Sequence, residues 1–262
     1  MSKHIKRSKI NRSYDGLDRE EKTGGLMAMR VIVILLIIAF VAFCVAMLVY
    51  NIIEENNSLS DSDTQTTVRY RSYTEEEAEE LIRCCNASSP LSDSYTADTV
   101  EYKDGISVNK LMAEDLERMI SKAHEEGIEI VVTKGYADAE ECDREFNSLK
   151  YEFQSSGATL AEAESRARAI FPPSQMNEYR TGLLIKVSDD DSYAFSKTKT
   201  YQWLYKNGTE YGFINRYTED KETRTGIDEN LTVYRYVGAE NAAKMRSYGM
   251  CLEEYYDYCS YR

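Results

Sequence analysis

Metal-binding side chains are scarce in this chain. Histidine occurs twice in 262 residues, as His4 and His124, so residues 51–262 cannot supply two imidazole ligands to one metal ion. His124 comes near the end of a predicted helix, where a cation interacts favourably with the helix dipole, and we expect that role for it. A site built on two or more histidines is therefore excluded in this part of the chain.

Thiols are the other soft ligands, and five of the six cysteines follow residue 50: Cys84, Cys85, Cys142, Cys251 and Cys259. Cys84 and Cys85 with Cys142 could bind a soft metal, but adjacent cysteines in a strand point to opposite faces. Outside the cytoplasm the five could form at most two disulfides, and one thiol would remain free or bridge to another chain. Free buried thiols are an equally good interpretation.

The charge of the chain is divided unevenly along its length. Lys and Arg total 32 against 45 Asp and Glu, a net charge of −13, which argues against nucleic-acid binding because phosphate contacts need clustered cations. Residues 1–30 hold eight bases and four acids, a net of +4, and residues 31–50 hold no charge. Residues 51–262 therefore hold the other 24 bases and 41 acids, a net of −17.

The uncharged segment 31–50 predicts a transmembrane helix. At about 1.5 Å per residue, a helix of this length matches a hydrocarbon core roughly 30 Å thick. A cleaved signal peptide would have a shorter apolar run and a small-residue exit, whereas this run ends in Leu48-Val49-Tyr50. Positively charged flanks stay in the cytoplasm, so 1–30 is expected to be a cytoplasmic basic leader and the rest extracytoplasmic. We expect a single-pass protein of the cell membrane.

The remaining chain is expected to comprise an extracytoplasmic stalk, 51–79, and a folded domain, 80–262. The stalk is polar, acidic and poor in aliphatic residues after Ile53. Helices and strands follow one another without a regular βαβ repeat, which indicates an α+β domain with a small antiparallel sheet. Expected helices begin at Thr74 and span 110–125, 138–154, 159–171, 201–205, 239–248 and 251–258, and expected strands cover 128–132, 183–187 and 233–237.

A series of motifs in this domain has a recognisable order. They are Lys134-Gly135-Tyr136-Ala137-Asp138, Asn177-Glu178-Tyr179-Arg180-Thr181-Gly182-Leu183-Leu184-Ile185-Lys186, Phe195, Trp203-Leu204, Asn207, Tyr211-Gly212-Phe213-Ile214, Arg216-Tyr217, Thr225-Gly226, Tyr234-Arg235-Tyr236-Val237-Gly238 and Leu252-Glu253-Glu254-Tyr255. In these residues, over roughly 80–258, the chain resembles the VanY-type zinc D-alanyl-D-alanine carboxypeptidases. That resemblance implies the D-Ala-D-Ala carboxypeptidase-like fold (Hedgehog/DD-peptidase), here on an N-terminal transmembrane helix.

The residues that carry the family's chemistry are replaced in this chain. The family holds zinc with a His and an Asp of the second motif and a His of a Glu-Pro-Trp-His segment, whose Glu is the general base. The corresponding ligand positions here are Tyr179, Lys186 and Val233, and the base position is Asn230. The arginine that binds the substrate carboxylate corresponds to Ala137. Valine has no lone pair, lysine is cationic, and a neutral amide cannot take a proton from a zinc-bound water.

Three hypotheses follow for the function. The first is a membrane-anchored, catalytically inactive carboxypeptidase-like protein of the bacterial envelope that holds no zinc and binds a cell-wall peptide or an envelope protein. The second is an active D-Ala-D-Ala metallopeptidase with unconventional ligands such as Asp189, Glu178 or cysteines. The third is a scaffold that binds a partner protein, with its cleft filled by Tyr179 and Lys186. The triplet Asp189-Asp190-Asp191 is better explained as a solvated acidic turn, because acidic residues are usually exposed.

Overall fold

The structure is a computed structural model that describes residues 71–188 and 193–260, together with 32, 35–37, 40, 41, 43 and 47. The chain divides into two units, Met1–Val68 and Arg69–Arg262. The described residues of the first unit are helical, and among all described residues no helix is long and apolar enough to cross a membrane. The expected leader 1–30, most of the expected segment 31–50, and the first part of the expected stalk lie outside the described residues.

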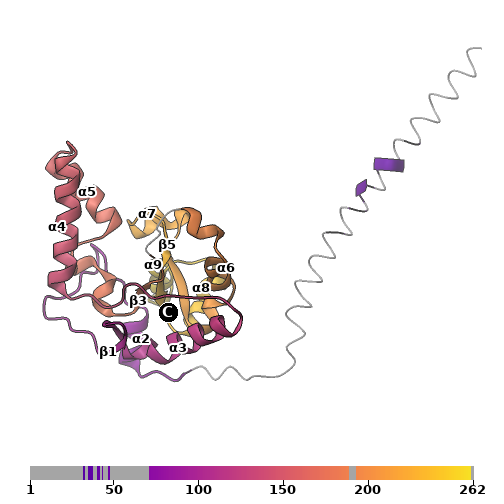
Figure 1. Ribbon diagram of the computed structural model, residues 1–262, viewed down its shortest axis with the longest axis horizontal. Coiled ribbons are helices and arrows are strands. Elements are labelled where there is room, and N and C mark those ends of the chain that lie inside the picture. The colour runs from indigo at the N-terminus through magenta and orange to yellow at the C-terminus, as the bar shows by residue number, and fades with distance from the viewer. Residues whose placement is uncertain are drawn as a thin grey trace, which may run out of the picture. The chain divides into compact units, whose positions relative to one another are not determined.

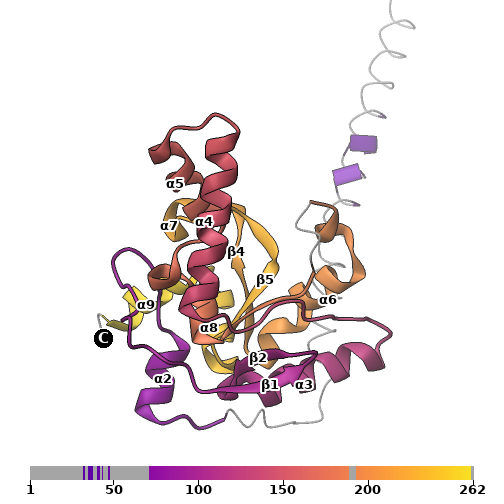
Figure 2. The same cartoon turned by 60° about the vertical axis from the view of Figure 1, so that its left-hand side comes forward.

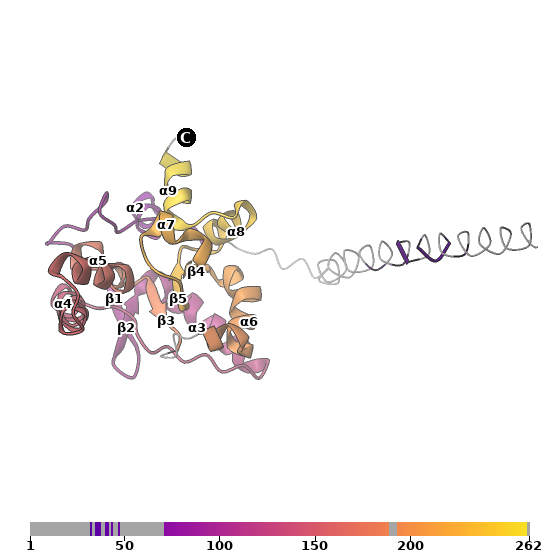
Figure 3. The same cartoon turned by 90° about the horizontal axis from the view of Figure 1, so that it is seen from above.

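The second unit is built around a three-stranded antiparallel sheet in the order β3 (Leu184–Lys186), β5 (Asn230–Tyr236), β4 (Phe213–Tyr217). A separate hairpin pairs β1 (Thr99–Lys103) with β2 (Ile106–Asn109). In Figures 1 and 3 the three-stranded sheet lies between the α4 and α5 helices on one side and α6 on the other. The expected α+β class with small antiparallel sheets is therefore confirmed.

The helices agree closely with the sequence pattern. Two of the helix starts form complete capping boxes, Thr74 with Glu77 and Thr159 with Glu162, and Asp138 caps the helix that follows it. The helices are α2 (Glu75–Leu81), α3 (Lys110–Glu125), α4 (Ala139–Ser155), α5 (Leu160–Ile170), α6 (Lys199–Asn207), α7 (Glu222–Thr225), α8 (Ala239–Tyr248) and α9 (Leu252–Ser260), with short 3-10 turns η1 (Ser174–Met176), η2 (Glu178–Thr181), η3 (Tyr193–Lys197), η4 (Gly208–Tyr211) and η5 (Glu219–Lys221).

The two faces of the central strand β5 have different surroundings. Tyr234 and Tyr236 are fully buried in the main core, where they pack with Leu116 and Met119 of α3. Val233 and Arg235 alternate with them and face the other side, where Val233 joins a second buried cluster. Figure 2 shows α4 and α5 beside each other and extending beyond the sheet, and α4 contributes Cys142 to this second cluster. The side of β5 that carries Val233 is the side on which the expected site residues lie.

Three strands, β1, β2 and β4, were missed, and one predicted strand was wrong. The chain at 128–132 is not paired as a strand, and pairing of this segment occurs further on, as a bridge from Lys134 to Lys186. The hairpin β1–β2 turns at Asp104 and Gly105, whose φ angles of 52° and 76° are those of a tight hairpin turn. An Asp-Gly pair between strand-forming residues is a standard hairpin signal, so the sequence contained the information.

The folded unit begins earlier than the expected boundary at residue 80. The Tyr73 hydroxyl lies 2.7 Å from the Tyr236 hydroxyl, which in turn donates to Asp115 Oδ2 at 2.5 Å. Arg71 Nη1 donates to the Leu111 carbonyl oxygen at 3.2 Å. The residues from Arg71 onward, including α2, are therefore part of the folded unit rather than of a stalk.

Candidate functional site

The site is built on Lys134, Lys186 and Val233, which come from three neighbouring backbone segments that pair with one another. Lys186 on β3 is the direct antiparallel partner of Val233 on β5, and the backbone of Lys134 forms an antiparallel bridge to Lys186 on its other side. Directly opposite residues project to the same face of a sheet, so the three side chains lie together. They line a cavity of about 330 Å³, which Tyr179 and Asn230 also line. Four of the five site positions expected from the sequence therefore meet in one cavity.

The turn η2 delivers Tyr179 to this cavity. Asn177 accepts a hydrogen bond from the Tyr179 N–H at 3.0 Å, and Gly182 ends the turn with a φ of 64°. A side chain at Gly182 would also approach the Asn109 backbone nitrogen to 2.9 Å, so glycine is required there. The Tyr179 ring stacks on Phe171 with 5.7 Å between ring centroids.

Ala137, the fifth expected position, lies beside the cavity. Its backbone N–H donates to the Tyr179 carbonyl oxygen at 3.2 Å, and its side chain is 1% exposed in a cluster with Tyr179 and Val233. A methyl group at this buried place cannot bind a carboxylate. The position of the expected carboxylate clamp has become part of an apolar wall.

Lys134 is a residue of this site that the sequence analysis did not single out as functional. Its ammonium lies 4.6 Å from the Phe171 ring centroid and 5.2 Å from that of Tyr179. It also forms ion pairs with Glu145, a close contact, and with Glu141 at 3.7 Å. The sequence placed Lys134 in the first motif, but nothing in it revealed these four partners.

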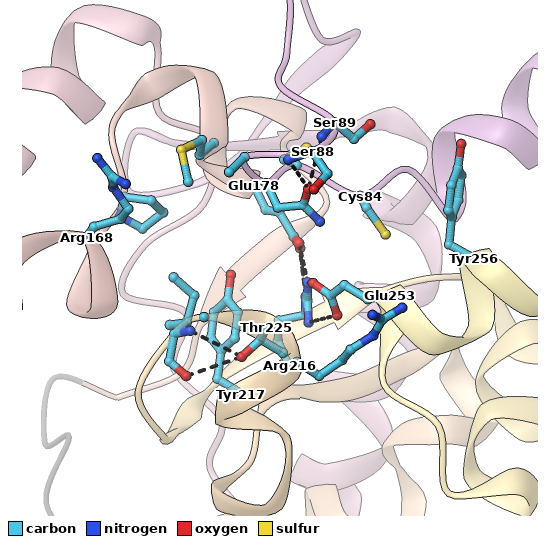
Figure 4. A pocket seen from close by; sticks show the side chains of 18 of the residues that line it. Cys84, Ser88, Ser89, Arg168, Glu178, Arg216, Tyr217, Thr225, Glu253 and Tyr256 are labelled. Carbon is cyan, nitrogen blue, oxygen red and sulfur yellow. Dashed lines mark hydrogen bonds and ion pairs between the residues drawn. The ribbon is translucent and has the colours of Figure 1, made fainter. Parts of the chain in front are cut away.

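A larger cavity of about 560 Å³ shares Pro172, Tyr217 and Ile227 with the first (Figure 4). At its wall the Arg216 guanidinium bridges two carboxylates, with Arg216 Nη2 2.6 Å from Glu178 Oε1 and 2.5 Å from Glu253 Oε1. All three side chains are buried. Burial disfavours the charged guanidinium, but the two carboxylates outweigh it and raise the pKa of Arg216 well above its usual value. We therefore interpret these three side chains as a buried structural ion-pair network.

The described side chains do not fit a zinc ion. Within residues 71–188 and 193–260 no group of three His, Cys, Asp or Glu side chains is placed to hold a metal. Glu178, one of the alternative ligands considered above, is held by Arg216 and lies 3.8 Å from Arg235. Burial raises the pKa of Cys142 to about 12, so its thiol is protonated at neutral pH. Asp189, Asp190 and Asp191 lie outside the described residues.

Comparison with known proteins agrees with this fold. The family model for VanY, D-alanyl-D-alanine carboxypeptidase, matches residues 105–239. The D-alanyl-D-alanine carboxypeptidase of Enterococcus faecalis strain ATCC 700802 / V583 is 28% identical over 180 residues, which is 69% of this chain and 67% of that protein. The fold and the match define a D-alanyl-D-alanine carboxypeptidase-like domain.

Two solved structures have a similar fold. The vancomycin-resistance D,D-pentapeptidase VanY of a VanB-type cassette, a mutant in complex with Zn(II), has a TM-score of 0.61 and 27% identity, covering 68% of this chain and 99% of that chain. VanYB in complex with D-alanine-D-alanine has the same TM-score and identity, covering 68% and 97%. This chain belongs to the VanY family.

Proposed function

We propose that this chain is a catalytically inactive member of the VanY family that binds a cell-wall peptide at the bacterial envelope. The observation that carries the proposal is the content of the smaller cavity: its expected ligand and base positions hold Tyr179, Lys186, Val233 and Asn230. These four side chains include no carboxylate or imidazole that could bind a metal ion, and no carboxylate that could serve as the general base. A peptidase of this class needs both, since the metal polarises the carbonyl and the base activates water.

Asn230 also has a local structural role that suits a non-catalytic residue. Its side-chain oxygen accepts hydrogen bonds from the Thr232 N–H at 3.1 Å and from the Thr232 hydroxyl at 2.7 Å. These bonds shape the start of β5, and a neutral amide in this place cannot act as a general base. The residue at the general-base position, Asn230, therefore stabilises the start of β5.

Retention of a cavity without its chemistry supports binding as the function. The relatives include a structure bound to D-alanine-D-alanine, and this chain keeps a cavity of about 330 Å³ at the corresponding motifs. That volume is at the lower end of the range for small-molecule sites, which is about 300–1,000 Å³. A dipeptide end is of this size, and the apolar side chains of the lining, Leu149, Leu184 and Val233, suit small aliphatic groups.

Zinc content and D-alanine release test inactivity directly. We expect the full chain, purified in mild detergent, to contain far less than one zinc per chain and to release no D-alanine from a peptide ending in D-Ala-D-Ala. Stoichiometric zinc together with release that a chelator abolishes would instead establish a working peptidase with unconventional ligands.

Binding is tested with purified peptidoglycan and a soluble D-Ala-D-Ala peptide. Ser148 lies on the exposed side of α4 and lines the cavity, so Ser148→Trp should block its mouth and lower retention on peptidoglycan. The matched control is Ser155→Trp, which changes an exposed serine at the end of the same helix, away from the cavity lining. If both variants are retained as well as the unmodified chain, the cavity does not bind the wall, and a partner protein becomes the better hypothesis.

Membrane anchoring through 31–50, with the N-terminus in the cytoplasm, is the second part of the proposal. It is supported by the charge-free segment, with a net charge of +4 before it and −17 after it. Reporter fusions after residue 60 are expected to be active outside the cytoplasm. Activity of a cytoplasmic reporter at that point would reverse the topology.

A further inference from the structure

A lysine ammonium is enclosed in the cavity wall. The Lys134 side chain is 21% exposed, and its Nζ lies over two aromatic rings, 4.6 Å from the Phe171 centroid and 5.2 Å from the Tyr179 centroid. Glu145 forms a close ion pair with the same Nζ. A cation over ring faces is attracted to them more strongly when it is shielded from water, so this arrangement favours a charged group.

The four interacting residues come from four separate parts of the chain. Lys134 belongs to the segment bridged to β3, Glu145 to α4, Phe171 follows α5, and Tyr179 belongs to η2. All four line the smaller cavity. Contacts at one ammonium therefore connect the sheet, the α4–α5 pair and the turn that carries an expected metal-ligand position.

We propose that Lys134 is a built-in cation that holds the walls of this cavity together, in a site whose side chains do not fit zinc. The inference goes beyond the proposed function, because it assigns a role to a residue outside the replaced ligand and base positions. It also gives a reason for the placement of Glu145, which neutralises a second positive charge beside Lys186 on the same face. A divalent metal ion in this cavity would share it with two lysine side chains.

Thermal melts of the full chain in mild detergent and excess chelator test this role. Lys134→Met keeps the aliphatic stem but removes the charge, and we expect the melting temperature to fall by about 4 °C or more, from the loss of a shielded cation–π contact and an ion pair. Lys134→Arg keeps both interactions and should retain most of the stability. Lys134→Met combined with Glu145→Gln should destabilise by less than the sum of the two single changes.

The matched control is Lys103→Met. Lys103 has the same two kinds of partner, the Tyr102 ring at 4.9 Å and Glu117 at 3.2 Å, but its side chain is 54% exposed and lies outside both cavities described. Solvent screens such a pair, so its loss should shift the melting temperature by about 1 °C or less. A drop for Lys103→Met as large as that for Lys134→Met would show that charge removal in general, and not the enclosed site, is responsible.

A second measurement keeps the proposal testable if Lys134→Met fails to fold. In the unmodified chain, the ε-methylene protons of Lys134 should be shifted upfield by the ring currents of Phe171 and Tyr179, and Glu145→Gln should reduce that shift. Unshifted ε-methylene signals, unchanged melting on Lys134→Met, or full additivity with Glu145→Gln would each overturn the role. Because the melts contain chelator, these outcomes are independent of the zinc and D-alanine measurements that test the proposed function.

Discussion

Lys186 and Val233 face each other directly across β3 and β5. The Val187 N–H donates to the Thr232 carbonyl oxygen at 2.9 Å, which makes Lys186 and Val233 a pair without hydrogen bonds between their own backbones. Side chains are closest in pairs of this kind, so an ammonium stem and an isopropyl group share the place where two metal ligands would have to converge. Both strands would therefore have to change together for this face of the sheet to present metal ligands.

We predict that single restorations will not produce D-alanyl-D-alanine carboxypeptidase activity. Tyr179→His alone leaves the Lys186 cation to repel a metal ion and Val233 without a donor. The smallest change with all required groups is Tyr179→His, Lys186→Asp, Val233→His and Asn230→Glu, with Ala137→Arg for the substrate carboxylate. D-Alanine release and zinc content are measured together, and zinc-dependent release by Tyr179→His alone would contradict this prediction.

Removal of the buried Arg216 charge should be strongly destabilising. Arg216→Met leaves Glu178 and Glu253 buried beside each other without their shared partner, and loss of one partner of a buried ion pair costs about 3–5 kcal/mol. Denaturant unfolding measures the change. The control Arg224→Met removes an exposed arginine paired with Asp257, which should cost at most about 1 kcal/mol. Equal losses in the two variants would disprove the special status of the buried network.

The stability of the domain should fall in acid partly because of Glu253. Burial opposes ionisation of its carboxyl group, but the Arg216 guanidinium outweighs burial and holds the pKa of Glu253 below its usual value. A carboxyl group with a lowered folded-state pKa stabilises above its unfolded value, about 4.3, and loses that contribution as the pH falls through the folded value. Melting temperatures from about pH 7 to pH 3 should therefore decline less steeply for Glu253→Gln.

The control for the acid limb is Glu240→Gln, which removes an exposed carboxylate paired with Lys244 on α8. Below about pH 4.3 its melting temperature should decline with pH as steeply as that of the unmodified chain, because an exposed ion pair contributes little to stability. An unchanged slope for Glu253→Gln would remove Glu253 from the explanation.

The described cysteines should differ in reactivity. Cys84, Cys85, Cys142 and Cys251 are buried, and burial raises the pKa of Cys251 to about 11 and that of Cys85 to about 12. The thiolate is the reactive form, so these thiols should be modified slowly near neutral pH, whereas the partly exposed Cys259 should be modified first among the five. Peptide mass spectrometry after brief iodoacetamide treatment measures this order, with urea-unfolded chain as the reference for full labelling. Uniform labelling of the native chain would show that the four sites open readily.

Helices were predicted well because their signals are local. Thr74, Asp138 and Thr159 each place a side-chain acceptor at a helix start, and an amphipathic spacing identifies α3. Strands depend on partners far along the chain. Four of the five residues at 128–132 are apolar, which is typical of a strand, but the segment is not paired and the bridge forms at Lys134. In contrast, β4 pairs with β5 although its aromatic motif has no clear alternation.

The site was predictable where a motif fixed the position and not where packing decides. Tyr179, Lys186, Asn230 and Val233 could be placed by counting within motifs, and the structure brings them together. The contact of Lys134 with Phe171 and the ion pair of Glu178 with Arg216 each join residues 37 or more positions apart. The sequence has no local signal for such contacts.

Tyr73 joins the beginning of the folded unit to the last residue of its central strand, through the 2.7 Å contact with Tyr236. Chain ends usually fray first, since few contacts hold them. Here the residues just before α2 are held in place. Tyr73 contacts Tyr236 of β5, which donates to Asp115 of α3, and Arg71 donates to the Leu111 carbonyl oxygen of α3. A force applied to the chain at Arg71 is therefore expected to act on β5 and α3 before it acts on α2.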